Sequence, residues 1–71
     1  MDDKRAQIEH NFTYHAPKPG QPERFNALRE KAKELALLIA ELTPVSREQS
    51  LALTELEAAT MWANAAIARN E

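Results

Sequence analysis

Residues 22–50 read PERFNALREKAKELALLIAELTPVSREQS, and this stretch decides the fold. Pro22 suits the first turn of a helix, where a backbone N–H would have no partner within the helix. Behind it runs a heptad-spaced apolar seam made up of Phe25, Leu28, Ala32, Leu35, Ile39 and Leu42. Pro44 then interrupts the pattern, so the spacing predicts a long helix over residues 22–43.

A second long helix is predicted after Pro44, over residues 46–70. Ser46, followed three residues later by Gln49, is a capping-box pattern. The seam of this helix consists of Ala52 or Leu53, Leu56, Ala59 or Thr60, Ala63 and Ile67. Because the connection between the two segments is short, we expect them to form an antiparallel hairpin.

The N-terminal part of the chain is broken up by proline and glycine. Three of the four prolines lie around the only glycine, Gly20, so residues 10–21 are predicted to form a loop. Residues 1–9 are predicted to form a short helix, starting near Asp2 or Asp3 and making apolar contacts through Ala6 and Ile8. We therefore expect one all-α domain, residues 1–71, in which a short helix and a loop precede the hairpin.

The apolar residues are few and small for a chain that must fold alone. Of 31 apolar residues, 13 are alanine, and there is no cysteine for disulfides. A chain below about 70–80 residues rarely gains more than ~3–5 kcal/mol from its own core. Leu37 lies nearly opposite the heptad seam, where a lone hairpin would leave it in water. Composition therefore predicts that the hairpin assembles into a multimer.

Composition also excludes several classes of protein. The net charge is −2, whereas a general DNA- or RNA-binding protein would be basic. No apolar run approaches the roughly 20 residues of a membrane span, and no signal peptide is visible. The sequence has no Gly-rich phosphate loop, nucleophile elbow or His-Glu-x-x-His motif, so we expect neither an enzyme nor a cofactor.

The chemistry-bearing residues gather in the loop and just beyond it. Residues 1–33 carry a net charge of +2, and residues 34–71 one of −4. Phe12 and Tyr14 offer ring faces on which bases can stack, and the helix start after the loop favours anions. The nearby cations are Arg24 and Lys31, seven residues apart on one helix face, and Arg29 on the other side. This pattern indicates a small phosphorylated ligand that contains a base.

Each of these residues also has a purely structural interpretation. Phe12 fits a hydrophobic plug at the end of the hairpin, and Tyr14 fits a plug or a ligand contact equally well. Arg29 and Lys31 suit salt bridges to Glu23, Glu30 or Glu34, and Arg69 suits the negative end of the second helix dipole. Met61 and Trp62 fit a core or an interface. His10 and His15 alone are too weak a pair to predict a metal site.

Four segments in order carry a family resemblance: FTYHAPK at 12–18, RFNALR at 24–29, SREQS at 46–50 and WANAAIARN at 62–70. Together they resemble the small phage anti-CBASS sponge proteins, which act against a bacterial antiphage system that signals through cyclic oligonucleotides. A larger relative that sponges cyclic ADP-ribose signals in Thoeris immunity shares the hairpin core. The resemblance implies hexamers that sequester cyclic dinucleotides, such as cyclic GMP-AMP, between protomers without cleaving them. Some members also bind cyclic trinucleotides at separate sites.

The resemblance also suggests residue roles and a cellular setting. Tyr14 matches the loop tyrosine of the family's dinucleotide pocket, and Lys31 is our choice for its helix lysine, with Arg29 and Arg24 as alternatives. Arg69, joined by Asn11, is expected at the second, trinucleotide-type site. Phe12 and His15 are the remaining candidate ligand contacts of the loop. The expected location is the cytoplasm of the infected bacterial host, with no DNA or membrane partner.

Two other functions compete with this interpretation. One is a helical-hairpin adaptor that binds a protein through the Leu37/Leu38 and Met61/Trp62 surfaces. The other is a small phage DNA-binding regulator, against which the acidic second helix argues.

Overall fold

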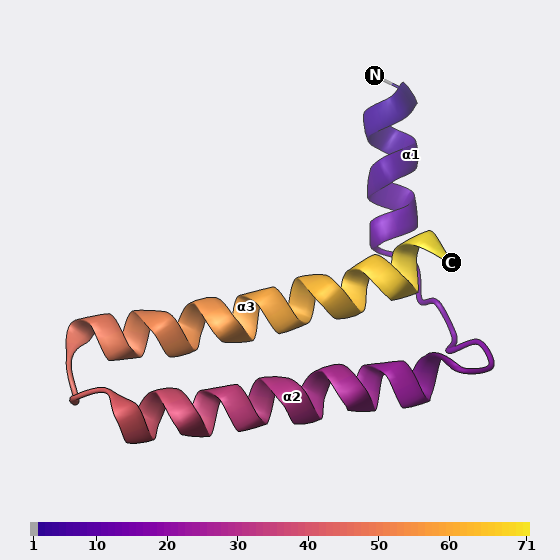
Figure 1. Ribbon diagram of the computed structural model, residues 1–71. Helices are drawn as coiled ribbons and strands as arrows, with labels where there is room; N and C mark the ends of the chain where they lie inside the picture. The colour runs from indigo at the N-terminus through magenta and orange to yellow at the C-terminus, as the bar shows by residue number, and fades with distance from the viewer. Residues whose placement is uncertain (1) are drawn as a thin grey trace.

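Residues 2–71 form three helices, α1 (Asp2–Asn11), α2 (Gln21–Leu42) and α3 (Arg47–Asn70). The structure is a computed structural model and describes residues 2–71, with side chains from residue 3. Residues 2–71 contain no strand, so the all-α prediction is confirmed. In Figure 1, α2 and α3 run side by side in opposite directions, and α1 projects from the open end of this hairpin.

A tight turn sets the start of α2. The backbone N–H of Gln21 donates to the carbonyl of Lys18 at 3.0 Å, and Gly20 between them has φ 85° and ψ −16°. This is the geometry of a type II turn, with Pro19 and Gly20 at its two central positions. Glycine is required there because a side chain makes a positive φ costly. The turn fixes the backbone positions of Lys18 and Gln21.

The connection between α2 and α3 is held by Gln49. The backbone N–H of Gln49 donates to Ser46 Oγ at 3.1 Å, as the capping pattern predicts. The Gln49 side chain does not return to Ser46. Its Nε2 donates to the Thr43 carbonyl and hydroxyl at 3.0 and 3.1 Å, which caps the end of α2. Thr43 is extended because a residue before proline disfavours the helical region, so α2 ends at Leu42.

The contact between the two long helices departs from the heptad seam. The half-buried row of α2 is formed by Phe25, Leu28, Ala32, Ala36 and Ile39. Leu35 and Leu42, which the heptad spacing places in the seam, are exposed. The reason is that a straight helix repeats every 3.6 residues and drifts about 20° per heptad. On α3 the sequence left two seam positions open between neighbouring residues. In each pair the second residue, Leu53 or Thr60, is the half-buried one.

The short helix α1 extends beyond the residues 1–9 predicted from the sequence. It also lacks the apolar contacts that the sequence predicted for it. It continues to Asn11, so His10 and Asn11 belong to the helix and not to the loop. Ala6 and Ile8 are exposed, which contradicts the predicted apolar contacts. Met1 lies outside the described residues.

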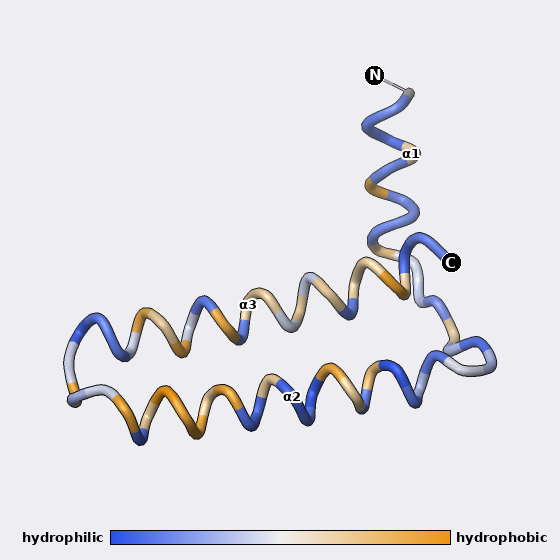
Figure 2. Tube along the Cα trace, in the orientation of Figure 1, coloured by the Kyte–Doolittle hydropathy of each residue, from blue (hydrophilic) through white to orange (hydrophobic). Residues whose placement is uncertain are grey.

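The hairpin is a single layer of helices with no closed core. Its smallest dimension is 13 Å, about the diameter of one helix with its side chains. The radius of gyration is 15.7 Å, against roughly 11 Å for a compact chain of this length. Among residues 3–71 no apolar side chain is fully buried, and Leu37, Met61 and Trp62 are each more than half exposed. Apolar residues are concentrated in the half of α2 next to its connection with α3 (Figure 2). No helix in residues 2–71 has a stretch apolar enough to span a bilayer.

Candidate functional site

Two histidines fasten the loop and α1 to the end of α3. His10 Nε2 lies 2.6 Å from the carbonyl oxygen of Arg69, and His15 Nε2 lies 2.8 Å from the carbonyl oxygen of His10. Because a carbonyl oxygen only accepts, both Nε2 atoms carry a hydrogen and donate it. The two rings lie 4.5 Å apart between centroids. The pair thus positions the loop. Residues 2–71 contain no cluster of three side chains suited to a metal ion.

Three hollows in the described part of the chain are considered for ligand binding, and the first lies where the loop meets the end of α3. It has a volume of about 640 Å³, within the usual range of small-molecule pockets. We call it the loop hollow; it is lined by His10, Tyr14, His15, Ala16, Lys18, Gln21, Ala68, Arg69, Asn70 and Glu71. Tyr14 is 83 % exposed, so its ring is accessible for stacking. The loop hollow brings an aromatic ring close to the cations Lys18 and Arg69.

Glu71 is held in the loop hollow by three side chains from the loop and the first turn of α2. Arg24 donates to both carboxylate oxygens of Glu71, with Nη1 2.9 Å from Oε2. Gln21 Nε2 donates to Oε1 at 3.4 Å, and Lys18 Nζ donates to the Glu71 carbonyl. The hydrogen bond from Arg24, followed by that from Gln21, lowers the pKa of Glu71 to about 2. The same hydrogen bond raises the pKa of Arg24.

Acid is expected to release Glu71 from this cluster. Its folded pKa is about 2 and its ordinary value is 4.5, so the cluster contributes fully to stability above about pH 4.5. The contribution is lost as the pH falls from 4.5 towards 2, because the carboxylate takes up a proton. We expect the Glu71 carboxyl carbon to titrate near pH 2 by NMR. An ordinary midpoint for Glu71 would contradict the ion pair.

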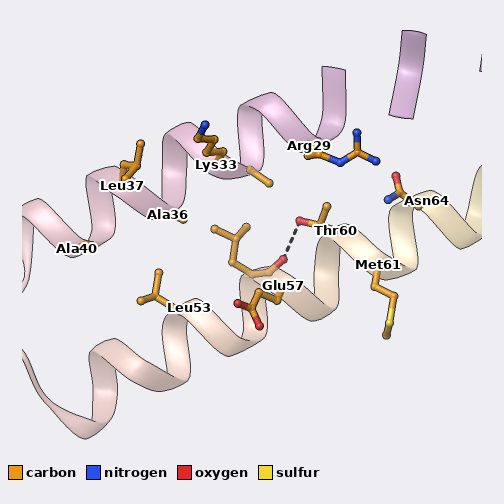
Figure 3. A pocket seen from close by; sticks show the side chains of 12 residues that line it. Arg29, Lys33, Ala36, Leu37, Ala40, Leu53, Glu57, Thr60, Met61 and Asn64 are labelled. Carbon is orange, nitrogen blue, oxygen red and sulfur yellow. Dashed lines mark hydrogen bonds between the residues drawn. The ribbon is translucent and has the colours of Figure 1, made fainter. Parts of the chain in front are cut away.

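The second hollow is a groove between α2 and α3. It has a volume of about 690 Å³, and Figure 3 shows the side chains around it. We call it the hairpin groove; it is lined by Arg29, Ala32, Lys33, Ala36, Leu37, Ala40, Leu53, Leu56, Glu57, Thr60, Met61 and Asn64. Arg29 and Asn64 lie at one end, and Leu37, Ala40 and Leu53 at the other (Figure 3). Asn64 Oδ1 is buried without a hydrogen-bond partner. The groove is mainly apolar at the end near Leu37, Ala40 and Leu53, and its polar side chains lie along the middle and at the end near Arg29 and Asn64.

A third, smaller hollow of about 390 Å³ lies against α2. It is lined by Arg24, Ala27, Leu28, Lys31 and Ile67, so the two cations do share one face of the helix. Lys31 Nζ lies 3.3 Å from the carboxylate of Glu34, a pair that the sequence allowed for. Arg29 instead donates to the side chain of Asn26 at 2.9 Å. Both contacts are exposed pairs on the surface of α2 and contribute little to stability.

The candidate residues are thus divided among separate surfaces of one chain. Tyr14, His15 and Arg69 share the loop hollow, whereas Arg29 lines the hairpin groove. Lys31 does not line the hollow that contains Tyr14. Asn11 and Phe12 line none of the three hollows, and Phe12 is 87 % exposed. Phe12 therefore does not plug the end of the hairpin within a single chain, as one structural interpretation of the sequence required.

Sequence reasoning missed Lys18, Gln21 and Glu71 as parts of one cluster. Their contacts join residues up to 53 positions apart, and such contacts leave no local pattern in a sequence. The Pro-Gly pair before Gln21 was the one available signal, because it predicts a tight turn that aims neighbouring side chains.

A family model described as the Acb2/Tad1 hairpin domain matches residues 4–68 of the chain. The matched region contains α2, nearly all of α3 and most of α1, together with the loop between α1 and α2. The search of curated proteins and the search of solved structures each found no match.

Proposed function

This chain belongs to the Acb2/Tad1 hairpin family, and on that premise we propose that it sequesters cyclic nucleotide messengers of bacterial antiphage defence. The proposed ligands are cyclic dinucleotides such as 3′,3′-cyclic GMP-AMP, with cyclic trinucleotides as a second class. They would be held intact and released unchanged when the protein unfolds. Sequestration in the cytoplasm of an infected bacterium would lower the free messenger concentration and so inhibit CBASS signalling.

The loop hollow is the observation that carries this proposal. The exposed ring of Tyr14 offers a stacking face, and Lys18 and Arg69 offer charged donors at the edge of the same hollow. A cyclic dinucleotide needs both kinds of contact, because its bases stack on aromatic rings and its phosphodiesters pair with cations.

We also propose that the binding unit is a homo-oligomer, and a hexamer is the expected form. The one-layer hairpin leaves Leu37, Met61 and Trp62 in water, which a second copy of the chain would cover. Lys31 and Tyr14 line different hollows of one chain. A pocket that contains both would therefore be assembled from two protomers, with the loop of one facing the helix of the next.

A protein-binding adaptor is the second candidate, favoured by the same exposed apolar side chains. An adaptor would use the hairpin groove for a partner protein and would need no ligand in the loop hollow. A thermal-shift panel of cyclic nucleotides separates the two functions, because a ligand that binds only the folded state raises its melting temperature.

The decisive experiment is isothermal titration with 3′,3′-cyclic GMP-AMP, followed by heating and chromatography of the released ligand. Tight binding with intact ligand recovered is the expected result. Recovery of linear ligand would mean that the protein is a nuclease. The absence of binding to this ligand, to a cyclic trinucleotide and to a cyclic ADP-ribose would favour the adaptor.

A further inference from the structure

The cluster around Glu71 has the composition of an anion-binding site, and the anion in it comes from the same chain. We infer that Glu71 acts as a built-in competitor of the ligand: its carboxylate occupies the place in the loop hollow that a ligand phosphodiester would take. The identification of the anion as a phosphodiester rests on the proposed function. The presence of an anion site next to Tyr14 and Arg69 is argued from the structure and does not depend on the proposed function.

One donor of this site, the side-chain amide of Gln21, is held in place by bonds that do not involve Glu71. Gln21 is only 4 % exposed, and its Oε1 accepts the backbone N–H of Lys18 at 2.9 Å. This bond leaves the amide nitrogen of Gln21 directed at Glu71, 3.4 Å away. The turn through Gly20 holds both residues, since the backbone of Gln21 bonds that of Lys18 in return. A buried amide held in this way is part of a preformed site, unlike a mobile surface side chain.

Arg24 is the part of the site that suits a phosphodiester best. It donates to both oxygens of the Glu71 carboxylate, which is the forked arrangement that guanidinium groups also make with phosphate oxygens. Arg24 lines the small hollow with Lys31 while reaching Glu71 in the loop hollow. It therefore lies at the boundary between the two surfaces that the proposed pocket would combine.

The charge of Glu71 opposes a ligand in two ways. It engages the donors of Arg24, and it places a negative charge in the hollow that a phosphate would enter, where like charges repel. Removing the side-chain charge of Glu71 would leave Lys18, Arg24 and Arg69 as the charged side chains around the site. A ligand would then bind without first displacing the carboxylate. Glu71 therefore sets the affinity of the site below the value that its cations alone would give.

The test compares the parent protein with Glu71→Gln, using Glu55→Gln as the control. Both variants lose one negative charge from α3 or its end, but Glu55 lies outside all three hollows. In titrations with 3′,3′-cyclic GMP-AMP we expect Glu71→Gln to bind about threefold to tenfold more tightly, the scale of one exposed ion pair plus repulsion. Glu55→Gln is expected to stay within about twofold of the parent. Glu71→Ala should match Glu71→Gln, since both lack the carboxylate.

Inorganic pyrophosphate separates this inference from the proposed function. If no variant binds the cyclic dinucleotide, a pyrophosphate-dependent rise in melting temperature of Glu71→Gln, smaller or absent in the parent and in Glu55→Gln, would support the anion site alone. Equal responses of all three proteins to both probes would show that Glu71 is not a competitor. If the cyclic dinucleotide binds the parent and Glu71→Gln equally, the inference fails while the proposed function stands.

Discussion

Replacing Leu37 with glutamate is expected to dissociate the proposed oligomer and to lower its melting temperature by about 10 °C or more. Leu37 lines the hairpin groove and is 62 % exposed in the single chain. Covering one such side chain contributes about 1.5–3 kcal/mol, and a carboxylate in its place would have to lose its water. A loss of 1 kcal/mol shifts the melting temperature of a domain of this size by roughly 4–8 °C. The prediction is checked by sedimentation velocity and thermal melting at equal protein concentrations.

Val45→Glu is the matched control for this experiment. Val45 lies in the turn between α2 and α3, is 95 % exposed and lies outside the groove, so the same change of chemistry should leave mass and melting temperature unchanged. Met61→Glu, which changes an apolar residue that α3 contributes to the groove, is expected to reproduce the dissociation. If Leu37→Glu and Met61→Glu both keep the parent's mass and stability, the groove is not an interface between copies.

The helices were predictable because their signals are local. Pro44 and the Ser46–Gln49 pattern act within one turn of the chain, and the structure has a helix end and a helix start there. The second role of Gln49, as a cap on α2, was not predictable in the same way. It depends on how closely the turn brings Thr43 to the start of α3.

The packing within the hairpin was predicted less well than its helices. Four of the six heptad positions in α2 are half-buried, as predicted. The prediction is wrong for Leu35 and Leu42, which are exposed. A sequence period of 3.5 describes helices that supercoil around a partner, whereas a single straight pair follows 3.6. The sequence also has apolar residues outside the seam, such as Leu37, and these predicted the exposed apolar side chains that the structure has.

The candidate site was predictable as a set of residue types but not as an arrangement. Tyr14 and Arg69 were identified from the sequence as contacts at two separate sites, but both line the loop hollow. Arg24 was expected to face a ligand, yet it pairs with Glu71, 47 residues away. No propensity or period relates two such positions, because their contact exists only after the hairpin has closed and the loop has turned at Gly20.

Replacing Tyr14 with alanine is expected to weaken the binding of 3′,3′-cyclic GMP-AMP by about 5-fold to 150-fold. One base stacked on an aromatic ring contributes ~1–3 kcal/mol, which corresponds to this range of dissociation constants. The ring is 83 % exposed in the unliganded chain, so its removal should change the free energy of unfolding by about 0.5 kcal/mol or less. Isothermal titration measures the first effect, and thermal melting without ligand measures the second.

Two companion variants identify the contact that is lost. Tyr14→Phe keeps the ring and should bind within about threefold of the parent if stacking dominates the contact. Phe12→Ala removes a ring of similar exposure two residues away that lines none of the hollows, so it should leave the affinity nearly unchanged. If Phe12→Ala weakens binding and Tyr14→Ala does not, the ligand stacks on Phe12 and not on Tyr14. The loop hollow would then not be its site, and the competition by Glu71 would have no ligand to oppose.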